Sequence, residues 1–170
     1  MAAPFFKDDL EVLNYALTLE HLEAAFYTKV NGSGVLSGDA AKYLKVIGDH
    51  ETAHVSALTD AITKAGGKPV KARASYDFSP LGDITTQAGV LKVAMALEGT
   101  GVKAYDGAAR EISDKSILGV AGQIVQVEAR HAGLVRSLVD PTKSPAPHFE
   151  DKATPQQILD AVKPLLGPEQ

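Results

Sequence analysis

The sequence contains no cysteine among its 170 residues. Disulfide bonds, thiolate zinc sites and cysteine nucleophiles are therefore excluded, while either redox compartment remains compatible with the chain. There is no excess of positive charge either, because the formal net charge is −4, and this gives no indication of binding to nucleic acid or to an anionic membrane. No apolar run approaches the ~20 residues that a membrane-spanning helix needs, so we expect a soluble protein.

A signal peptide is not visible, because residues 1–9 contain no basic segment followed by an apolar core. We expect a cytoplasmic protein if Met1 is the native start, and a periplasmic or secreted protein if an export signal has been trimmed. The length fits one domain, and a hydrophobic content of 45% is enough to fill a single sizeable core.

Two copies of the pattern Glu-x-x-His carry the chemistry of the sequence. The first lies in Asp49–His54, Asp-His-Glu-Thr-Ala-His, and the second in Val127–His131, Val-Glu-Ala-Arg-His. Residues three apart share one face of a helix, about one turn from each other, so each Glu and His can reach the same point in space. A helix can offer two ligands to one metal ion in this way. A single copy is weak evidence, because so short a motif also arises by chance.

The surroundings of the two motifs strengthen the case. Each is preceded by a lone Glu that is followed seven residues later by a Tyr, as Glu20 with Tyr27 and Glu98 with Tyr105. The corresponding residues of the two sets are 77 or 78 positions apart. This spacing predicts an internal duplication of a helical hairpin, in which each half supplies one Glu and one Glu-x-x-His.

The apolar periodicity predicts four long helices in an all-α fold. They are expected at residues 8–29, 39–65, 85–111 and 115–138. Asp8 or Asp9 is a suitable cap for the first of them. The irregular segment 68–83 joins the two hairpins and is long enough to cross the length of a bundle.

The C-terminal part differs in composition from the helices. Residues 141–153 contain Pro, Ser and Lys and are expected to form an extended strap. Thr154-Pro-Gln-Gln157 resembles a capping box with proline at the first helical position, and predicts a short helix that ends near residue 166. We therefore expect a four-helix bundle over residues 1–140, and over residues 141–170 a strap with a short helix docked on the bundle.

Superposing the four apolar seams places six polar residues at one level of the bundle. Four carboxylates buried together without partners would cost several kcal/mol each, and the seams offer no Lys or Arg. Two divalent cations would balance the charge and leave the histidines neutral and able to coordinate. The alternatives are surface charges on misphased helices, or a buried network in which some Glu are protonated. The six residues are Glu20, Glu51, His54, Glu98, Glu128 and His131.

Over residues 8–139 this pattern resembles the ferritin-like superfamily of di-iron and di-manganese carboxylate proteins. The segment Leu13–Tyr27, Leu-Asn-Tyr-Ala-Leu-Thr-Leu-Glu-His-Leu-Glu-Ala-Ala-Phe-Tyr, is similar to the opening helix of the desiccation-related ferritin-like family. The resemblance implies a ferritin-like four-helix bundle of two antiparallel hairpins with a long crossover, plus a short C-terminal helix. It also implies a set of metal ligands. The lone residues Glu20 and Glu98 would bridge the metals or bind terminally, and the motif residues Glu51 and Glu128 would bridge or cap the pair. His54 and His131 would each bind one metal.

Four further positions bear on the ligand set and its surroundings. Rubrerythrin-like sites add a carboxylate three residues after the Glu of the third helix, where this chain has Gly101. Glu23, one turn beyond Glu20, is an alternative ligand whose phase leans off the seam. The glycines at positions 99, 101 and 107 of one predicted helix indicate either close helix packing or a small-molecule channel beside Glu98.

The remaining tyrosines and histidines have weaker signals. Tyr27 and Tyr105 are candidate catalytic residues that hydrogen-bond the ligand shell or carry an electron, and the alternative is that they are ordinary core tyrosines. His21 and His50 stand beside ligands and are expected at the surface or behind the ligands. His148 lies in the tail and is expected to be exposed.

Donors of oxygen and nitrogen without thiolate suit iron or manganese. The resemblance implies two Fe ions, or alternatively Mn, that react with dioxygen or peroxide in ferroxidase, oxidase or peroxidase chemistry. The alternative functions are non-catalytic iron storage or sequestration, desiccation stress protection, and a structural role in which segment 68–83 and the tail bind a partner. Expected partners are dioxygen or peroxide and further copies of the chain in a homo-oligomer, without nucleic acid or a membrane span.

Overall fold

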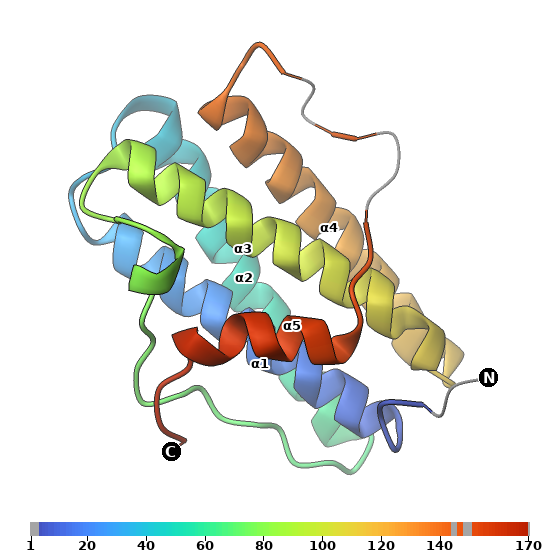
Figure 1. Ribbon diagram of the computed structural model, residues 1–170. Coiled ribbons are helices and arrows are strands. Elements are labelled where there is room, and N and C mark those ends of the chain that lie inside the picture. Colours follow the sequence, from blue (N-terminus) through green and yellow to red (C-terminus); the bar gives the residue numbers. More distant parts are fainter. Residues whose placement is uncertain (1–3, 144–145, 148–150, 170) are drawn as a thin grey trace.

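The computed structural model describes residues 4–143, 146–147 and 151–169. Four long helices form the bundle (Figure 1): α1 (Asp9–Asn31), α2 (Gly38–Lys64), α3 (Gln87–Ala108) and α4 (Lys115–Val139). A short helix, α5 (Pro155–Val162), lies across α1 and α3. Over the described ranges the remaining regular structure is limited to three 3-10 turns and one isolated antiparallel bridge: Ser79–Leu81, Ala109–Glu111, Lys163–Leu165, and Tyr76 with Leu166. The predicted all-α class is confirmed.

Local capping sets where the helices begin. The side chain of Asp8 accepts a hydrogen bond from the backbone N–H of Glu11 at 3.0 Å, so the predicted cap of α1 is confirmed. Thr154 forms the predicted capping box at the start of α5. The third helix begins two residues later than predicted because Thr86 caps it, and its last residues, 109–111, tighten into a 3-10 turn.

The two hairpins pack as a four-helix bundle. Helix α1 packs against α2 and α3 against α4, and the hairpins meet through contacts of α1 with α3 and of α2 with α4. The connection between α2 and α3 runs the length of the bundle from the end of one hairpin to the start of the other (Figure 1). Two contacts hold it to α1: the N–H of Val70 donates to Asn14 Oδ1 at 2.8 Å, and the ring of Phe78 packs edge-on against Phe26. The predicted crossover is therefore present.

The core consists of two apolar clusters that pack around a polar level. One contains Leu13, Leu17, Leu58 and Ile124. The other is larger and includes Phe26, Ile47, Leu97 and Val135. On α2 and α4 the change from one cluster to the other falls at Glu-x-x-His, whereas on α1 and α3 the larger cluster continues on both sides of the lone Glu. The chain therefore holds its charged residues at mid-height, with apolar packing above and below them.

The C-terminal segment is tied to α3. Backbone N–H of Ala153 donates to the carbonyl of Lys103 at 3.3 Å, and a Cβ at Gly107 would lie 1.8 Å from the carbonyl oxygen of Ala153. Gly107 is therefore explained by close packing of the strap. Ile158 and Val162 of α5 are buried in the larger apolar cluster. Among the described residues, no helix combines the length and the apolar character needed to cross a membrane.

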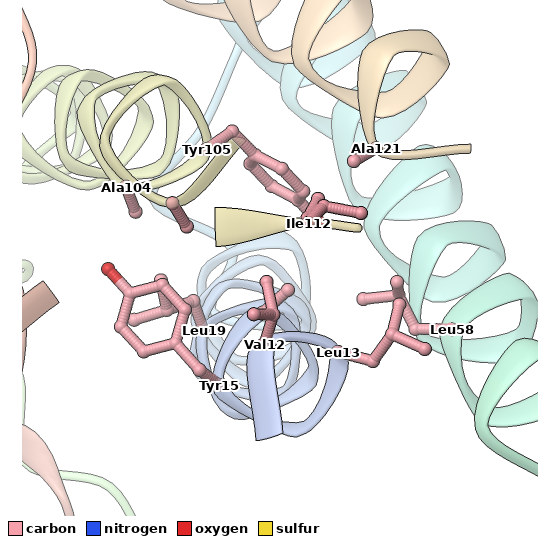
Figure 2. Close-up of a pocket in the computed structure, with 11 residues that line it drawn as sticks. Val12, Leu13, Tyr15, Leu19, Leu58, Ala104, Tyr105, Ile112 and Ala121 are labelled. Atoms are coloured by element: carbon pink, nitrogen blue, oxygen red, sulfur yellow. The ribbon is translucent and has the colours of Figure 1, made fainter. Parts of the chain in front are cut away.

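A small apolar cavity lies where the two clusters meet, between α1, α2, α3 and α4 (Figure 2). Its volume is about 10 Å³, which corresponds to about one water-sized molecule. Val12, Leu13, Leu58 and Ala121 form part of its wall, together with the ring of Tyr105. The hydroxyl of Tyr15 beside it is buried and makes no hydrogen bond within the described part of the chain.

Candidate metal centre

The six residues predicted from the seams meet at one point of the bundle. The four carboxyl groups are fully buried, and only 8% of His54 and 4% of His131 is exposed. They form two overlapping groups, and in each group one donor atom per residue lies within 4.8 Å of the others. Both groups include Glu51 and Glu128; the first is completed by Glu20 and His54, and the second by Glu98 and His131.

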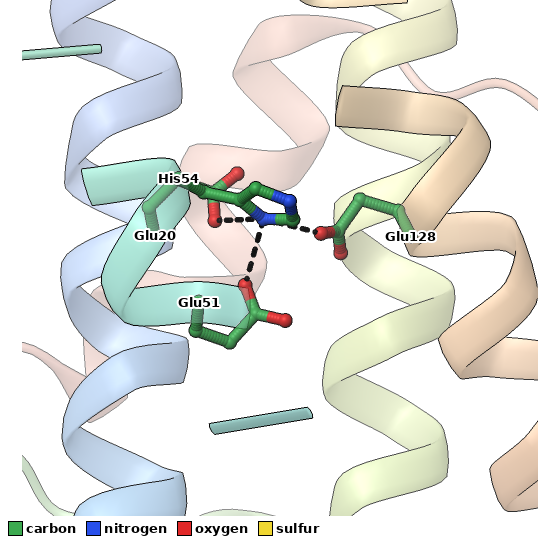
Figure 3. Close-up of side chains that lie close together, drawn as sticks. All are labelled: Glu20, Glu51, His54 and Glu128. Carbon is green, nitrogen blue, oxygen red and sulfur yellow. Dashed lines mark hydrogen bonds and ion pairs between the residues drawn. The ribbon is translucent and has the colours of Figure 1, made fainter. Parts of the chain in front are cut away.

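The first group is arranged around the Nδ1 atom of His54 (Figure 3). This nitrogen lies 3.3 Å from Glu20 Oε2, 3.2 Å from Glu51 Oε2 and 3.0 Å from Glu128 Oε1. The three carboxylates come from three different helices, α1, α2 and α4. The His and Glu of α2 reach the same point because they are three residues apart.

The second group repeats the arrangement around the Nδ1 atom of His131. This nitrogen lies 2.9 Å from Glu51 Oε1 and 3.4 Å from Glu98 Oε2. Glu51 thus directs one oxygen toward each histidine. A carboxylate placed between two donor groups in this way has the geometry of a bridging ligand.

Two tyrosines hold the lone carboxylates from the opposite hairpin. The hydroxyl of Tyr105, on α3, donates to Glu20 Oε1 at 2.5 Å, and that of Tyr27, on α1, donates to Glu98 Oε1. The two tyrosines therefore make the predicted hydrogen bonds to the carboxylate cluster and are not merely core residues. Each bond leaves the second oxygen of the Glu directed at the centre of the cluster.

Glu23 is buried beside the centre, although it belongs to neither donor group, contrary to the expectation that it leans off the seam. Only 2% of it is exposed, and its Oε2 atom makes no hydrogen bond within the described residues. The reason lies on α3: a Cβ at Gly101 would lie 3.2 Å from Glu23 Oε1 and 3.0 Å from Glu128 Oε2. The absent side chain makes room for these carboxylates, so Gly101 serves packing around the cluster. A Cβ at Gly99 would meet nothing within 4 Å.

The other histidines occupy different places. His50 is exposed, yet its Nδ1 atom lies 2.9 Å from Nε2 of His131, and the two ring planes are nearly parallel, at an interplanar angle of 17°. His21 lies apart from the cluster, with Nε2 3.3 Å from the carbonyl oxygen of Val70. The prediction for His148 falls outside the described residues.

Burial dominates the electrostatics of the carboxyl groups. Desolvation raises the pKa of Glu20 to about 7, although the hydrogen bond from His54 acts against it. Burial and the neighbouring carboxylates also raise the pKa of Glu23 and of Glu128 well above the usual range. Without a cation, several of these groups are therefore held in the protonated form at neutral pH.

Glu51 and the two histidines shift in the opposite sense. Burial opposes ionisation of Glu51, but hydrogen bonds from His131 and His54 outweigh it and lower its pKa to about 2. Burial likewise opposes charge on the histidines, but the surrounding carboxylates raise the pKa of His54 to about 12 and that of His131 to about 10. The imidazolium groups thus occupy, in the metal-free protein, the place that a cation would take.

The donor atoms fit metal ions better than they fit one another. Oxygen atoms of all five buried Glu, and Nδ1 of His131, are fully enclosed and make no hydrogen bond of regular geometry within the described residues, although several of them lie at ion-pair distance from one another. Buried polar atoms without partners are rare and costly. Four carboxylates and two imidazoles around two points, with the carboxyl group of Glu23 beside them, are a donor set suited to a pair of divalent cations.

The fold and the site together define an all-α bundle with a candidate metal centre in its core. The chain belongs to the ferritin-like domain family, whose sequence model matches residues 8–141. This confirms the superfamily resemblance, while assignment to the desiccation-related group remains a prediction. No curated protein matches the chain.

Two solved structures share the fold. One is the "conserved hypothetical protein, rv2844" of Mycobacterium tuberculosis, with 16% identity and a TM-score of 0.69 over 76% of this chain and 96% of that one. The other is the "hypothetical protein MJ0754" of Methanococcus jannaschii, with 12% identity and a TM-score of 0.68 over 96% of both chains. At these identities the likeness concerns the fold alone.

Proposed function

We propose that this chain is a non-haem dinuclear metal protein that binds two iron ions, or alternatively manganese, and reacts with dioxygen or peroxide. The observation that carries the proposal is the pair of overlapping donor groups that share Glu51 and Glu128. Their unpartnered oxygen atoms leave a buried negative charge that needs cations nearby. Ions held in this way would supply Lewis acidity and, for iron, electrons to a small oxidant.

In this proposal each residue of the cluster has a distinct task. Glu51 and Glu128, which both donor groups share, would help to hold both ions, and the lone carboxylates would hold one ion each. His54 and His131 would each hold one ion through Nδ1, the atom that faces the carboxylates. Glu23 would be a seventh ligand, because it is buried against Glu128 with an oxygen that has no partner in the described chain.

The tyrosines orient the lone carboxylates and are the candidates for carrying an electron. Tyr27 and Tyr105 are fully and almost fully buried, and their hydroxyls bond Glu98 and Glu20. Burial raises both pKa values well above the usual range, so both hydroxyls keep their protons at neutral pH. Each one therefore remains a donor that fixes a single carboxylate rotamer, which keeps the other oxygen available for metal.

Metal stoichiometry tests the proposal directly. Protein purified without chelator and loaded anaerobically with ferrous iron or manganese should contain two equivalents by elemental analysis. Glu51→Ala and Glu128→Ala should each disturb both ions, whereas His54→Ala should weaken mainly one. Asp60→Asn removes an exposed carboxylate from the same helix as Glu51 and should change nothing. A wild-type limit of one equivalent or none would refute the dinuclear centre.

Reactivity is a separate measurement. Iron-loaded protein mixed with dioxygen or hydrogen peroxide should be oxidised faster than free ferrous iron under the same conditions, as followed by absorbance in a stopped-flow instrument. Full occupancy by iron without accelerated oxidation would assign the chain to metal sequestration and not to oxidoreductase chemistry. The same preparation therefore separates the two functions.

A further inference from the structure

The ring of His131 lies between the buried carboxylates and an exposed second imidazole. Its Nδ1 atom faces Glu51 Oε1 at 2.9 Å, while Nε2 on the opposite side of the ring lies 2.9 Å from Nδ1 of His50. His50 is on α2, one residue before Glu51, and His131 is on α4, so the contact joins the two hairpins. His50 belongs to neither donor group.

We propose that His50 is a positioning residue for His131, and this rests on the dinuclear centre proposed above. A metal ion on Nδ1 of His131 leaves the proton of the neutral ring on Nε2, and an imidazolium carries a proton there as well. In both states the Nε2–H group donates, so Nδ1 of His50 accepts. The proton of His50 must then be on its own Nε2. The contact thus fixes the tautomer and the ring plane of a ligand.

The internal repeat shows that this contact is confined to one half. His50 precedes the Glu of the first motif, and the corresponding residue before Glu128 is Val127, which has no acceptor. The two ligand histidines are therefore positioned differently, because the ring of His131 is hydrogen-bonded to a second imidazole and that of His54 has no such partner in the repeat. The ion in the Glu98 and His131 group is the one that His50 supports.

A direct ligand role for His50 conflicts with the geometry. Nδ1 of His50 is engaged at 2.9 Å by Nε2 of His131, which is itself on the outer side of that ring. The ring planes are nearly parallel, at 17° to each other, as an in-plane hydrogen bond between the two ring nitrogens requires. A residue that touches the ligand and not the ion should change affinity without removing an equivalent.

The test compares His50→Val, which copies the residue of the other half, with His50→Gln, whose amide oxygen can accept. Stepwise titration of metal-free protein with cobalt(II), followed by absorption and calorimetry, should show one of two equivalents weakened about 10–100-fold in His50→Val. His50→Gln should recover much of this loss. Val127→Ala is the matched control and should bind both ions like wild type. Because His50 is exposed, the metal-free His50→Val protein should keep the wild-type fold, as checked by far-UV circular dichroism.

A second readout needs no metal. Long-range ¹⁵N spectra of the metal-free protein should show His50 as the neutral Nε2–H tautomer, and Nδ1 should lose its hydrogen-bonded shift in a His131→Ala variant. The proposal is overturned if His50→Val binds both ions like wild type, if it loses a whole equivalent, or if His50 carries its proton on Nδ1. A wild-type protein that binds fewer than two ions would instead overturn the dinuclear centre and the positioning role with it.

Discussion

Removal of metal should give this protein an unusual dependence of stability on pH. In the metal-free chain, burial raises the pKa of Glu20 to about 7 from 4.5, and it raises the pKa values of Glu23, Glu98 and Glu128 in the same direction. The folded state therefore holds protons on these groups that the unfolded state has already released. Their contribution to stability is complete below pH of about 4.5 and is lost as the pH rises toward the folded pKa.

The other titrating groups do not reverse this trend. The pKa values of His54 and His131 are raised to about 12 and about 10, so their contribution is complete below about 6.5 and is lost above it. The pKa of Glu51 is lowered to about 2, so its contribution is complete above 4.5 and is lost only in acid. Metal-free protein should therefore be most stable near pH 4.5 and lose stability steadily between pH 5 and pH 8.

The size of the effect follows from Glu20, which is fully buried. The difference between its folded and unfolded pKa values is worth about 3 kcal/mol, against a total stability of about 5–15 kcal/mol for a typical domain. Urea unfolding of chelator-treated protein, followed by far-UV circular dichroism at pH 5 and pH 8, measures it. Glu20→Gln should remove about 3 kcal/mol of the difference, and Asp60→Asn should leave it intact. Stability that is equal or higher at pH 8 would refute the reasoning.

Three further predictions concern single side chains. Tyr15→Phe should raise the free energy of unfolding by about 1–2 kcal/mol without changing metal content, because the hydroxyl is buried without a partner in the described residues; a decrease would reveal a missing partner. Gly99→Ala, in open space within α3, should stabilise the protein by up to about 1 kcal/mol. Gly107→Ala should destabilise the protein, because the new Cβ would collide with Ala153. Thermal melts that rank the two variants in the reverse order would contradict both assignments. Tyr27→Phe should keep two ions but weaken their binding about 10-fold in a metal titration, and wild-type affinity would exclude an orienting role.

The fold could be predicted from the sequence because its signals are local. Each helix has its own apolar periodicity, and the caps at Asp8 and Thr154 depend only on residues a few positions away in the sequence. The duplication then predicts which helices pack together. Two equal hairpins that carry ligands at matching heights can pack in only a few ways. The short C-terminal helix was also predictable, whereas the contact of the strap with Gly107 was not, because it joins segments with no shared pattern.

The centre was only partly predictable for a physical reason. Glu23 lies about 60° around α1 from Glu20, so its position in the sequence is compatible with a side chain that faces the cluster or the surface. It faces the cluster because Gly101, on another helix, has no side chain there. The same holds for His50, whose neighbour in sequence is Glu51 but whose partner is His131. The hydrogen bonds of the tyrosines cross between hairpins, and one helix alone gives no sign of them.

Helix α5 has a consequence for self-association. It packs against α3, and its residues Ile158 and Val162 are buried in the larger apolar cluster. A second copy could reach the covered surface of α3 only by peeling away the C-terminal segment, at the cost of exposing that apolar surface again. A homodimer that keeps the segment in place would have to form elsewhere.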